Sequence, residues 1–363
     1  MESKTGPDRV LITAVFMLVS IGVIMIYSSS GYMSQSKLDD QLYYFKKQLT
    51  WLALSLPFFF MTYKLNYQAY HKLAAPALLL GFILLTAVLF LPATRGVHRW
   101  MRIGPINVQA TEVFKYCIII FMAHSLSKQL GRIQNFKELL LPYLAILVMF
   151  VLLILKEPDL GSTILICAIF VTMLFISKAR LTHLATFLLP AVAGFLILVF
   201  GLGYEKDRME SYLKGLNDPL AGSYQLRQSA ISLGSGGWNG IGLGEGRQKF
   251  LFLPEPHTDF IFASIGEEGG FVALAGILGL FLLVALRGVN IATRAPDYFG
   301  FLLAAGISIA IFFSVLVNVG VVTGVLPTTG IPLPFLSYGG SSLILSLCAV
   351  GILLNISKQS VAT

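Results

Sequence analysis

Charged residues are scarce in this sequence. Asp, Glu, Lys and Arg together make up 12% of its 363 residues, while hydrophobic residues make up 56%. Ordinary soluble domains contain about 25% charged residues, so this composition excludes that class. Apolar runs of about 17 to 25 residues recur along the chain, and each can cross a hydrocarbon layer of about 30 Å as a helix. We predict an all-α polytopic membrane protein.

Cysteine is also rare, and its placement argues against a metal centre. The three cysteines, Cys117, Cys167 and Cys348, all lie inside apolar runs, where a free thiol behaves as a small buried hydrophobic group. No Cys-x-x-Cys motif or Cys/His cluster that would suggest zinc occurs. The alternation of apolar and polar residues typical of membrane β-barrels is absent as well. Helices are therefore the predicted spanning elements.

About ten segments are predicted to span the membrane within a single integral membrane domain. One connection, residues 203–257, is much longer than the others and separates the seventh segment from the eighth. A run of serines after the first segment mimics a signal-peptide cleavage region, but the spans that follow indicate an uncleaved anchor. The predicted spans are residues 10–28, 49–63, 73–93, 112–126, 139–155, 161–177, 181–202, 258–286, 299–326 and 338–356.

Basic residues predict the orientation and the partners. The formal net charge of +8 is spread thinly over many connections, which argues against nucleic acid and favours membrane lipid as a partner. Short connections rich in Lys and Arg fall on the side of the N-terminus, so both termini are predicted to be cytoplasmic and residues 203–257 extracytoplasmic. The cations left on the outer side suggest an anionic ligand there: Arg95, Arg99, Arg102, Lys156, Arg208, Arg227, Arg247 and Lys249.

A cluster of ionisable residues opens the eighth predicted span. Glu255, His257 and Asp259 lie within eight residues that end at Phe260. A carboxylate at the bilayer centre costs roughly 2.5 to 3.5 kcal/mol, so an acid in or beside a span is a candidate functional group. In the structural alternative, His257 or Thr258 caps the helix and Asp259 lies in its first turn, stabilised by the helix dipole.

Two more acids, Glu267 and Glu268, follow in the same span. A continuous helix would place them about 12 Å beyond Asp259 and on different faces. Their predicted structural role is a buried hydrogen bond or an ion pair. Small residues four, seven and eleven positions after Asp259 would share its helix face and let another helix or a lipid chain approach closely.

A charged pair occupies the start of the fourth span. Glu112 and Lys115 are three residues apart, which allows them to pair on one helix face. Pairing would relieve most of the cost of placing either charge in hydrocarbon. The functional alternative directs Lys115 at a phosphate or at Asp259.

Two outer connections carry further charges. Lys156 and Asp159 lie in the predicted hairpin between the fifth and sixth spans, and Arg99 precedes Trp100 one outer connection earlier. An aromatic residue beside a cation is typical of an interfacial belt, which is the structural alternative for that dipeptide. Acids and cations thus gather on one predicted face of the membrane.

Two irregular segments complete this face. Residues 326–342 are apolar but contain three prolines, which cannot continue a helix. Non-helical backbone at membrane depth must be buried or line a cavity, so this segment is predicted to wall a groove that opens outward, with a plain surface loop as the alternative. The glycines of residues 234–247 predict tight turns or, alternatively, a loop whose N–H groups contact a diphosphate together with Arg247 and Lys249.

Several motifs together resemble the SEDS family, the RodA and FtsW proteins. Thr111 stands where many relatives carry Ser, a change that keeps the hydroxyl, and the proline-rich wording resembles the FtsW branch slightly more. The matching segments are His98-Arg99-Trp100, Thr111-Glu112-Val113-Phe114-Lys115, Glu157-Pro158-Asp159-Leu160-Gly161, Tyr224-Gln225 with Gln228-Ser229, residues 254–260 and residues 332–342.

The resemblance implies a peptidoglycan glycosyltransferase with about ten transmembrane helices and a large outer loop after the seventh. Such a protein polymerises lipid II, an undecaprenyl-diphosphate-linked disaccharide peptide, at the outer face of the bacterial inner membrane. It works with a class B penicillin-binding protein in cell division or elongation. The family's catalytic aspartate corresponds to Asp259 here.

A mechanism follows as a hypothesis. Asp259 is the candidate general base for the attacking sugar hydroxyl. Arg99, Lys115 and Lys156 are the candidate cations for the leaving diphosphate, with a divalent cation, Mg or Mn, as an open addition. A lipid II flippase and a non-catalytic scaffold that recruits a penicillin-binding protein remain the alternatives. The predicted substrate-binding residues are Arg99, Trp100, Glu112, Lys115, Lys156, Asp159, Gln228, Glu255, His257, Thr258, Ser337 and Ser341.

Overall fold

The computed structural model describes residues 6–92, 98–103, 106–129, 141–217, 222–250 and 252–360. Within these ranges, long helices coincide with all ten predicted spans, and the predicted helical architecture is confirmed. They are α1 (Arg9–Leu38), α2 (Tyr43–Lys64), α3 (Ala69–Phe90), α4 (Ala110–Lys128), α5 (Leu141–Lys156), α6 (Leu160–Ile176), α7 (Leu181–Leu196) with η2 (Ile197–Gly201), α10 (Ile261–Thr293), α11 (Tyr298–Val322) and α12 (Gly340–Gln359).

Length and composition make these helices membrane spans. In the described part of the chain, six helices are long and apolar enough to cross a membrane, namely α1, α3, α7 with η2, α10, α11 and α12, and α5 and α6 are shorter apolar helices. A helix satisfies its own backbone N–H and C=O groups, which hydrocarbon requires. The chain is a multi-pass membrane protein.

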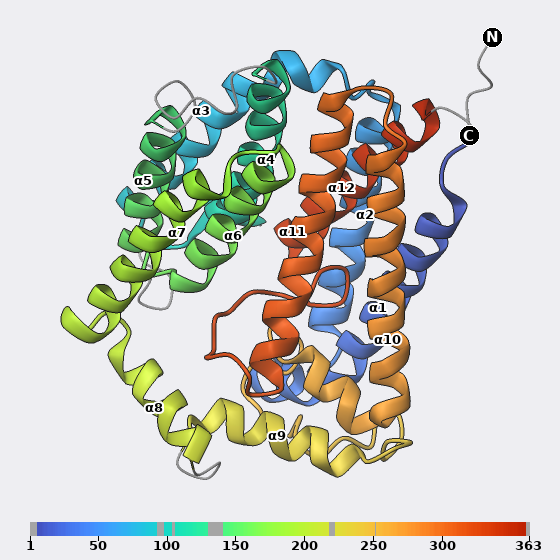
Figure 1. Ribbon diagram of the computed structural model, residues 1–363. Coiled ribbons are helices and arrows are strands. Elements are labelled where there is room, and N and C mark those ends of the chain that lie inside the picture. The colour runs from blue at the N-terminus through green and yellow to red at the C-terminus, as the bar shows by residue number, and fades with distance from the viewer. Residues whose placement is uncertain are drawn as a thin grey trace.

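The helices form two groups that meet at α4 and α11. Figure 1 shows α3 to α7 on one side and α1, α2, α10, α11 and α12 on the other. Within the second group α12 packs on α2, and α10 packs on α1 and α11, while α4 contacts α3, α6, α11 and α12. The described core is continuous across both groups.

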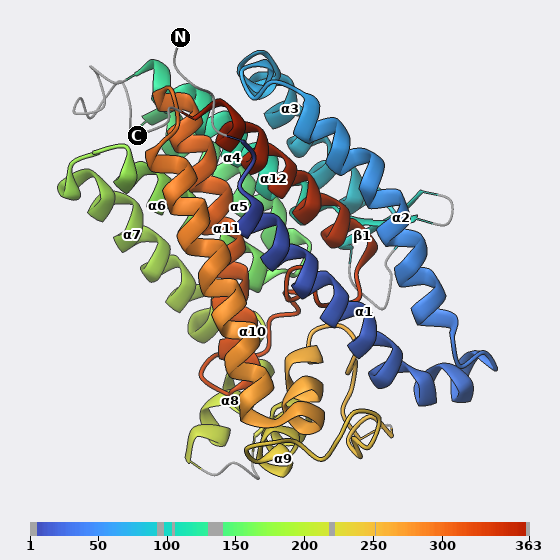
Figure 2. The ribbon, with the colours of Figure 1, turned by 90° about the vertical axis from the view of Figure 1, so that its right-hand side faces the viewer.

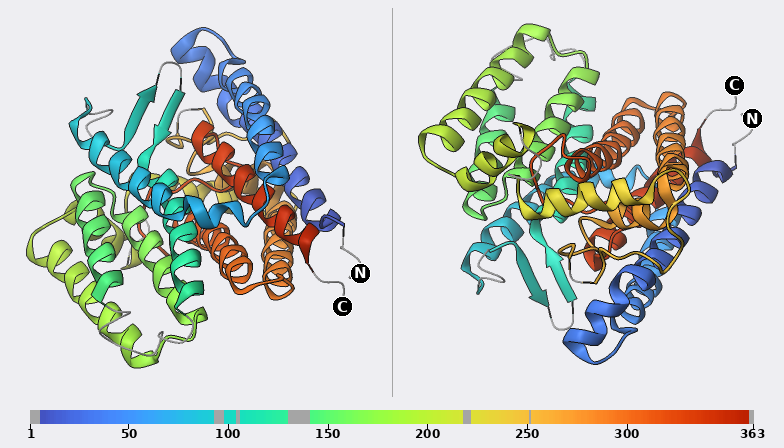
Figure 3. Two further views of the ribbon diagram at one scale, coloured as in Figure 1. Left: turned by 90° about the horizontal axis from the view of Figure 1, so that it is seen from above. Right: turned by 90° about the horizontal axis from the view of Figure 1, so that it is seen from below.

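The two ends of the bundle differ. The long connection between η2 and α10 contains α8 (Lys206–Asn217) and α9 (Tyr224–Gly236), and we call the end that carries them the loop end. In Figure 3, right, α9 crosses this end. Both chain termini lie at the opposite end, which we call the terminal end.

A small hairpin adds strands to the predicted all-α fold. Strand β1 (Trp100–Ile103) pairs antiparallel with β2 (Ile106–Gln109), and Trp100 is opposite Gln109. Their backbone groups pair with each other outside the helices. The hairpin joins α3 to α4 and carries Trp100 into the region just ahead of α4.

Helix α10 is not the continuous helix that the sequence predicts. Gly270 has φ 67° and ψ −170°, a conformation open essentially to glycine alone. A Cβ atom built on Gly266 would lie 3.0 Å from Leu274 Cδ1, although eight residues of straight helix would separate them by about 12 Å along the axis. The chain therefore doubles back at Gly270, as Figure 2 shows, into a short arm, residues 261–269, and a long arm, residues 271–293.

Backbone hydrogen bonds from the preceding loop hold this hairpin. The N–H groups of Ile241 and Gly242 donate to the carbonyls of Glu267 and Glu268 at 3.1 and 3.0 Å. Beyond the turn, the N–H of Phe271 donates to the Gly237 carbonyl at 2.9 Å. The loop thus pairs with both sides of the break, and its own course determines where the helix turns.

The hairpin reverses the predicted depth of the acids. Gly236, at the end of α9, lies against the Gly266 carbonyl, so the turn of the hairpin is at the loop end. The Asp259 carbonyl instead accepts from Asn318, four residues before the end of α11. Asp259 is therefore about one helical turn inside the bundle. Glu267 and Glu268 lie outward of it, and their predicted position deeper in the membrane is wrong.

Candidate functional site

Asp259 lies in the turn that precedes the short arm of α10. The helix begins at Ile261, and its N-cap residue Phe260 makes no side-chain cap. The predicted alternative, with Asp259 in the first turn, is therefore wrong. The half-buried Asp259 faces Gly330, since a Cβ atom on that glycine would lie 3.6 Å from Asp259 Oδ2. Gly330 has φ 77°, which favours glycine.

Side chains from two distant segments hold the backbone around Asp259. Asn318 Nδ2 of α11 donates to the Asp259 carbonyl at 2.9 Å and to the Ile331 carbonyl at 2.8 Å. Ser337 Oγ donates to the Thr258 carbonyl at 2.7 Å and accepts from Leu333 N–H at 2.8 Å. The candidate base is thus attached to α11 and to the proline-rich segment.

Glu255 and His257 shape the turn itself. Glu255 has φ 51°, and its carbonyl accepts from both the N–H and the hydroxyl of Thr258 at 3.2 Å. His257 is 1% exposed, and its ring packs on Tyr44 and Tyr338 with centroids 4.3 and 5.5 Å apart. The Tyr338 N–H donates to the His257 carbonyl at 2.8 Å. Of the predicted substrate-binding residues, Glu255, His257, Thr258 and Ser337 are brought together around Asp259.

The proline-rich segment has the irregular conformation that the sequence predicts. Residues 325–339 contain no helix, and Ile331, Leu333, Phe335 and Leu336 are buried. The segment enters the protein interior and lies against α1, where a Cβ atom on Gly22 would be 2.8 Å from Leu336 Cα. The alternative of a plain surface loop is wrong.

A second cluster surrounds Arg99. Arg99 Nε donates to the Glu157 carbonyl at 3.2 Å and lies 3.9 Å from Asp159 Oδ2, while Nη2 is 3.7 Å from Glu205 Oε1. Asp159 is 1% exposed and caps α6, accepting from Ser162 N–H at 3.0 Å and from its hydroxyl at 2.8 Å. Arg99 therefore joins the connection before β1, the start of α6 and the start of α8.

Glu157 is the unusual member of this cluster. Its side chain is 0% exposed, and neither carboxyl oxygen has a hydrogen-bond partner among the described residues. Burial, with a smaller contribution from nearby Asp159 and against the opposing effect of Arg99, raises the pKa of Glu157 to about 9. Glu157 is therefore protonated at neutral pH. The sequence motif contained Glu157, but only its burial in the fold distinguishes it from a solvated acid.

Glu205 was not predicted as a site residue. Burial raises its pKa, against the opposing effects of Arg208 and Arg99. Arg208 Nη1 lies 2.9 Å from Glu205 Oε2, which extends the cluster into α8. In sequence Glu205 is one of several charges in the long connection, so no local signal separates it from the others.

A groove lies beside this cluster. It encloses about 50 Å³ between the start of α6, the α7–η2 helix, the start of α8 and the proline-rich segment. A Cβ atom on Gly161 would lie 2.7 Å from Thr329 Cβ, and the next residue, Gly330, faces Asp259. One stretch of chain therefore walls the groove on one side and contacts Asp259 on the other, as predicted. The lining residues are Leu160, Gly161, Ile164, Phe195, Val199, Glu205, Arg208, Met209 and Pro327 to Thr329.

Glu112 and Lys115 form the predicted pair. Lys115 Nζ lies 2.9 Å from Glu112 Oε1 and 3.0 Å from Oε2, and both side chains are buried. The ammonium also lies 5.2 Å from the centre of the Tyr116 ring. The charge of Lys115 is thus matched inside α4.

The other predicted substrate-binding residues lie on separate elements. Trp100 is half-buried in β1, Lys156 is the exposed last residue of α5, Gln228 is half-buried in α9 and Ser341 is buried in the first turn of α12. Among the predicted outer cations, Arg95 lies outside the described residues. Lys156 directly precedes Glu157, which belongs to the Arg99 cluster.

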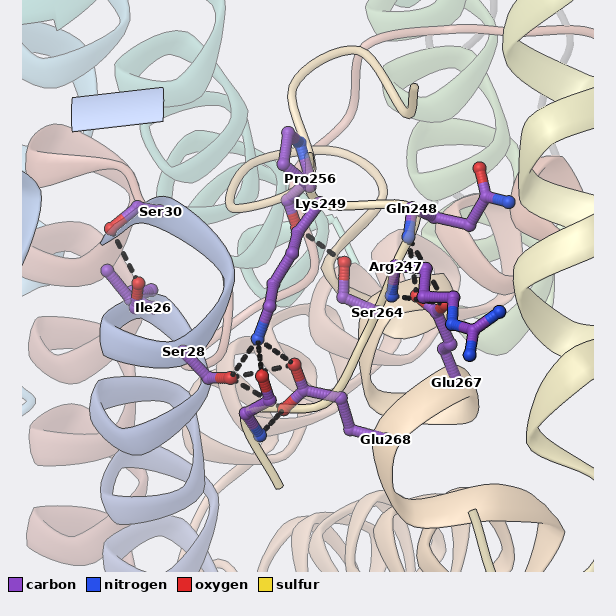
Figure 4. Close-up of polar contacts among 11 residues, drawn as sticks. Ile26, Ser28, Ser30, Arg247, Gln248, Lys249, Pro256, Ser264, Glu267 and Glu268 are labelled. Carbon is purple, nitrogen blue, oxygen red and sulfur yellow. Dashed lines mark hydrogen bonds and ion pairs between the residues drawn. The ribbon is translucent and has the colours of Figure 1, made fainter. Parts of the chain in front are cut away.

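The glycine-rich loop binds carboxylates of the protein itself, as Figure 4 shows. Lys249 Nζ lies 2.8 Å from Glu268 Oε1 and donates to the Gly244 carbonyl at 2.7 Å, and Ser28 Oγ of α1 donates to Glu268 at 2.6 Å. Glu267 accepts from Arg247 N–H at 2.8 Å. We call Ser28, Lys249 and Glu268 the hairpin brace. The glycines form turns, the first of the two predicted readings, and Lys249 pairs with Glu268.

The predicted mechanism left a divalent cation open, and the possible metal ligands among the described residues can be compared with that prediction. Within the described ranges, no three or more His, Cys, Asp or Glu side chains gather as metal ligands.

Known proteins are similar to this sequence over nearly its whole length. The family model for cell cycle proteins of the FtsW, RodA and SpoVE type matches residues 8–362. The chain is 40% identical over 361 residues to "Stage V sporulation protein E" of Bacillus subtilis (strain 168), covering 98% of each. It is 38% identical over 363 residues to "Probable peptidoglycan glycosyltransferase FtsW" of Geobacter sp. (strain M18), covering 99% of each.

Solved structures share the fold. A chain from the structure "Structural coordination of polymerization and crosslinking by a peptidoglycan synthase complex" matches with a TM-score of 0.80 and 27% identity, covering 97% of both chains. The rod shape determining protein RodA of Thermus thermophilus matches with a TM-score of 0.73 and 26% identity, covering 98% of both. The resemblance predicted from the motifs is confirmed: the chain belongs to the FtsW, RodA and SpoVE family of cell cycle proteins.

Proposed function

We propose that this protein is a peptidoglycan glycosyltransferase that polymerises lipid II, with Asp259 as the general base. Relatives that are 34–40% identical over nearly the full chain and carry the name of that activity support the reaction class. The observation that carries the assignment of Asp259 is its setting. Asn318 and Gly330 hold it beside the wall of the groove, about one turn inside the loop end.

The loop end is the outer face in this proposal, and both termini are cytoplasmic. A lipid-linked substrate can then reach the groove from the outer leaflet, with its polyprenyl tail along the apolar part of the lining and its sugars near Asp259. The groove lining supports this arrangement because Leu160, Ile164 and Phe195 are apolar whereas Glu205 and Arg208 are charged.

Proton transfer needs a base whose carboxylate is held in a fixed orientation. The acceptor sugar hydroxyl loses its proton to Asp259 as its oxygen attacks the anomeric carbon of the second lipid-linked sugar. Two separate hydrogen bonds, from Asn318 and from Ser337, hold the carbonyls of Asp259 and Thr258. Such anchoring lowers the entropic cost of bringing the reacting atoms together.

The leaving diphosphate needs positive charge. Arg99 and Arg208 already face Asp159 and Glu205, so a diphosphate would compete with those carboxylates for the guanidinium groups. Lys156 is exposed at the end of α5, next to Glu157, and its side chain can reorient toward a diphosphate. Protonated Glu157 helps because it adds no negative charge where the diphosphate develops one.

A flippase would need a polar route through the membrane. Glu267 and Glu268, which the sequence predicts to lie deeper than Asp259, would be the acids available for such a route. Both lie at the hairpin turn at the loop end, where Lys249, Ser28 and backbone N–H groups bind them. This removes the main support for transport as the primary function. Assembly with a penicillin-binding protein remains part of the proposal, supported by the matching chain of a peptidoglycan synthase complex.

Purified protein with its class B penicillin-binding protein, given lipid II in lipid nanodiscs, tests the assignment. Wild type should make glycan chains visible on a gel, and Asp259→Asn should make none while unfolding at the same temperature. Asp207→Asn, an exposed acid of α8, is the matched control and should retain activity. Polymer made by Asp259→Asn would refute the base, and lipid II translocation without polymer from wild type would establish the flippase instead.

A further inference from the structure

The terminal end contains a polar cavity far from the proposed active site. It encloses about 240 Å³ between the start of α1, the end of α10 and the end of α12. Three guanidinium groups, one amide and two hydroxyl side chains are among its lining residues: Arg9, Arg287, Arg294, Asn290, Ser357 and Ser360. These polar side chains come from three separate helices, and the Ser360 hydroxyl among them already donates to the Ile356 carbonyl at 3.1 Å, so the guanidinium and amide groups are the main donors.

One acid balances only part of this charge. Asp8 is 8% exposed, and it lies 2.6 Å from Arg287 Nη2 and caps α1 by accepting from Leu11 N–H at 3.0 Å. Arg9 and Arg294 are exposed, and no described acid pairs with either. Among the described residues that line the cavity there are three cations and one anion, an excess of two positive charges.

Ordinary structural roles do not account for the whole arrangement. Arg294 follows the last residue of α10, where a cation is stabilised by the helix dipole. That role needs neither a cavity nor a second helix. Here the Asp8–Arg287 pair joins α1 to α10, so the two unpaired guanidinium groups are carried on helices that are held together.

The chemistry of the lining points to a phosphate group. Guanidinium groups bind phosphate oxygens through paired N–H donors, and hydroxyl and amide groups add neutral donors. Basic pockets between transmembrane helices at the membrane edge are suited to acidic lipid headgroups. The cavity is as polar as such a headgroup and lies where the apolar spans end.

Neighbouring side chains indicate where the phosphate comes from. Val10, Leu286 and Val289 are 44%, 58% and 57% exposed on α1 and α10 beside the cavity, which is the surface that acyl chains would cover. A soluble phosphate would leave these side chains without a partner. We propose that the cavity binds a phosphate-bearing anion, and that its source is the headgroup of an anionic phospholipid in the leaflet at the terminal end.

Thermal unfolding of the full chain in neutral detergent tests this site, because a ligand that binds only the folded state raises the unfolding temperature. The probes are short-chain phosphatidylglycerol, short-chain phosphatidylcholine and inorganic phosphate at equal concentration. The variants are the double substitution Arg9→Gln with Arg294→Gln and, as matched control, Lys64→Gln with Lys72→Gln. The control removes two exposed charges at the same end but outside the cavity.

We expect phosphatidylglycerol to stabilise wild type and the control more than phosphatidylcholine does. The Arg9/Arg294 double variant should bind it about tenfold or more weakly. Arg294→Lys, which keeps the charge and loses the paired donors, should fall between them. Equal losses in the double variant and the control, or no loss in either, would overturn the site. Stabilisation by inorganic phosphate but not by phosphatidylglycerol would overturn the lipid source.

Discussion

Two buried acid–base pairs in this protein have nearly the same N···O distance, but one lies within a single helix and the other joins distant segments. Glu112 and Lys115 are 2.9 Å apart and belong to one helix, three residues from each other. Lys249 and Glu268 are 2.8 Å apart, but they join a loop to the turn of the α10 hairpin, and Ser28 of α1 joins them. The first pair lowers the free-energy cost of placing α4 in hydrocarbon, whereas the second determines how three segments meet.

This difference decides what each pair can control. Loss of the α4 pair alters one helix locally. Loss of the hairpin brace frees the turn at Gly270, and the short arm that begins beside Asp259 ends at that turn. The brace is therefore a positioning feature for the proposed base, about 12 Å away along the short arm.

Breaking the brace should have the largest effect. Glu268→Ala leaves the buried Lys249 without its counter-ion, and removing one partner of a buried pair costs about 3–5 kcal/mol. The unfolding temperature should fall, and glycan synthesis should fall with it. Glu268→Leu combined with Lys249→Met replaces the pair by apolar side chains and should recover much of the stability. A double variant no more stable than the single one would contradict the ion-pair explanation.

Gly270→Ala tests the hairpin that the brace supports. A Cβ atom there would lie 2.3 Å from Gly240 N, in a backbone conformation that costs about 1–3 kcal/mol for other residues. We expect a loss of about 3 kcal/mol in thermal or denaturant unfolding. Gly276→Ala in the long arm is the control, since nothing lies within 4 Å of its Cβ position. Equal effects of the two substitutions would mean that the chain does not double back at Gly270.

Charge reversal separates the local pair from the long-range one. Exchanging Glu112 and Lys115 keeps an i, i+3 pair on α4, so the free energy of unfolding should change by about 1 kcal/mol or less. Exchanging Lys249 and Glu268 should destabilise more, because Gly244 donates its N–H to Glu268 and accepts from Lys249. Similar stability losses would refute the distinction. Lost polymerisation in a stable α4 exchange would assign that pair to substrate binding.

A third buried acid extends the comparison, and its effect depends on pH. Glu157 is neutralised by a proton instead of a lysine, with a pKa of about 9 against 4.5 in the unfolded chain. Between these values the unfolded chain releases its proton and the folded chain keeps it, so wild type loses stability as the pH rises. Glu157→Gln removes this dependence. Its unfolding temperature relative to wild type should rise by about 2 °C or more from pH 5 to pH 8.

A constant difference across that range would mean that Glu157 ionises in the folded protein. Asp207→Asn, which lies on the exposed part of α8, provides the control and should track wild type at every pH.

Local features of the sequence were sufficient for several predictions. The ten helices, the irregular course of residues 326–342 and the Glu112–Lys115 pair were all predicted, because apolar length, proline and i, i+3 spacing act over a few residues. Four of the predicted substrate-binding residues do lie around Asp259. They were near it in sequence or belonged to the segment that packs on it.

The predictions that failed depended on contacts between distant segments. A diphosphate contact for Lys249 stayed open as an alternative, because nothing within several residues of it reveals Glu268 as its partner. Glu157 and Glu205 were not predicted as members of the Arg99 cluster, because burial by other helices, and not the neighbouring sequence, separates them from solvated acids.

The sequence by itself determined a multi-pass helical membrane protein, its family motifs and the place of Asp259 next to the eighth span. Only the tertiary structure decided that α10 folds back at Gly270, that Glu267 and Glu268 lie nearer the loop end than Asp259, and that Thr329 and Gly330 join the groove to Asp259. The physical reason is the distance along the chain over which each interaction acts. Helix formation and membrane insertion depend on neighbouring residues, whereas the direction of a hairpin and the partner of a buried charge depend on which surfaces pack together.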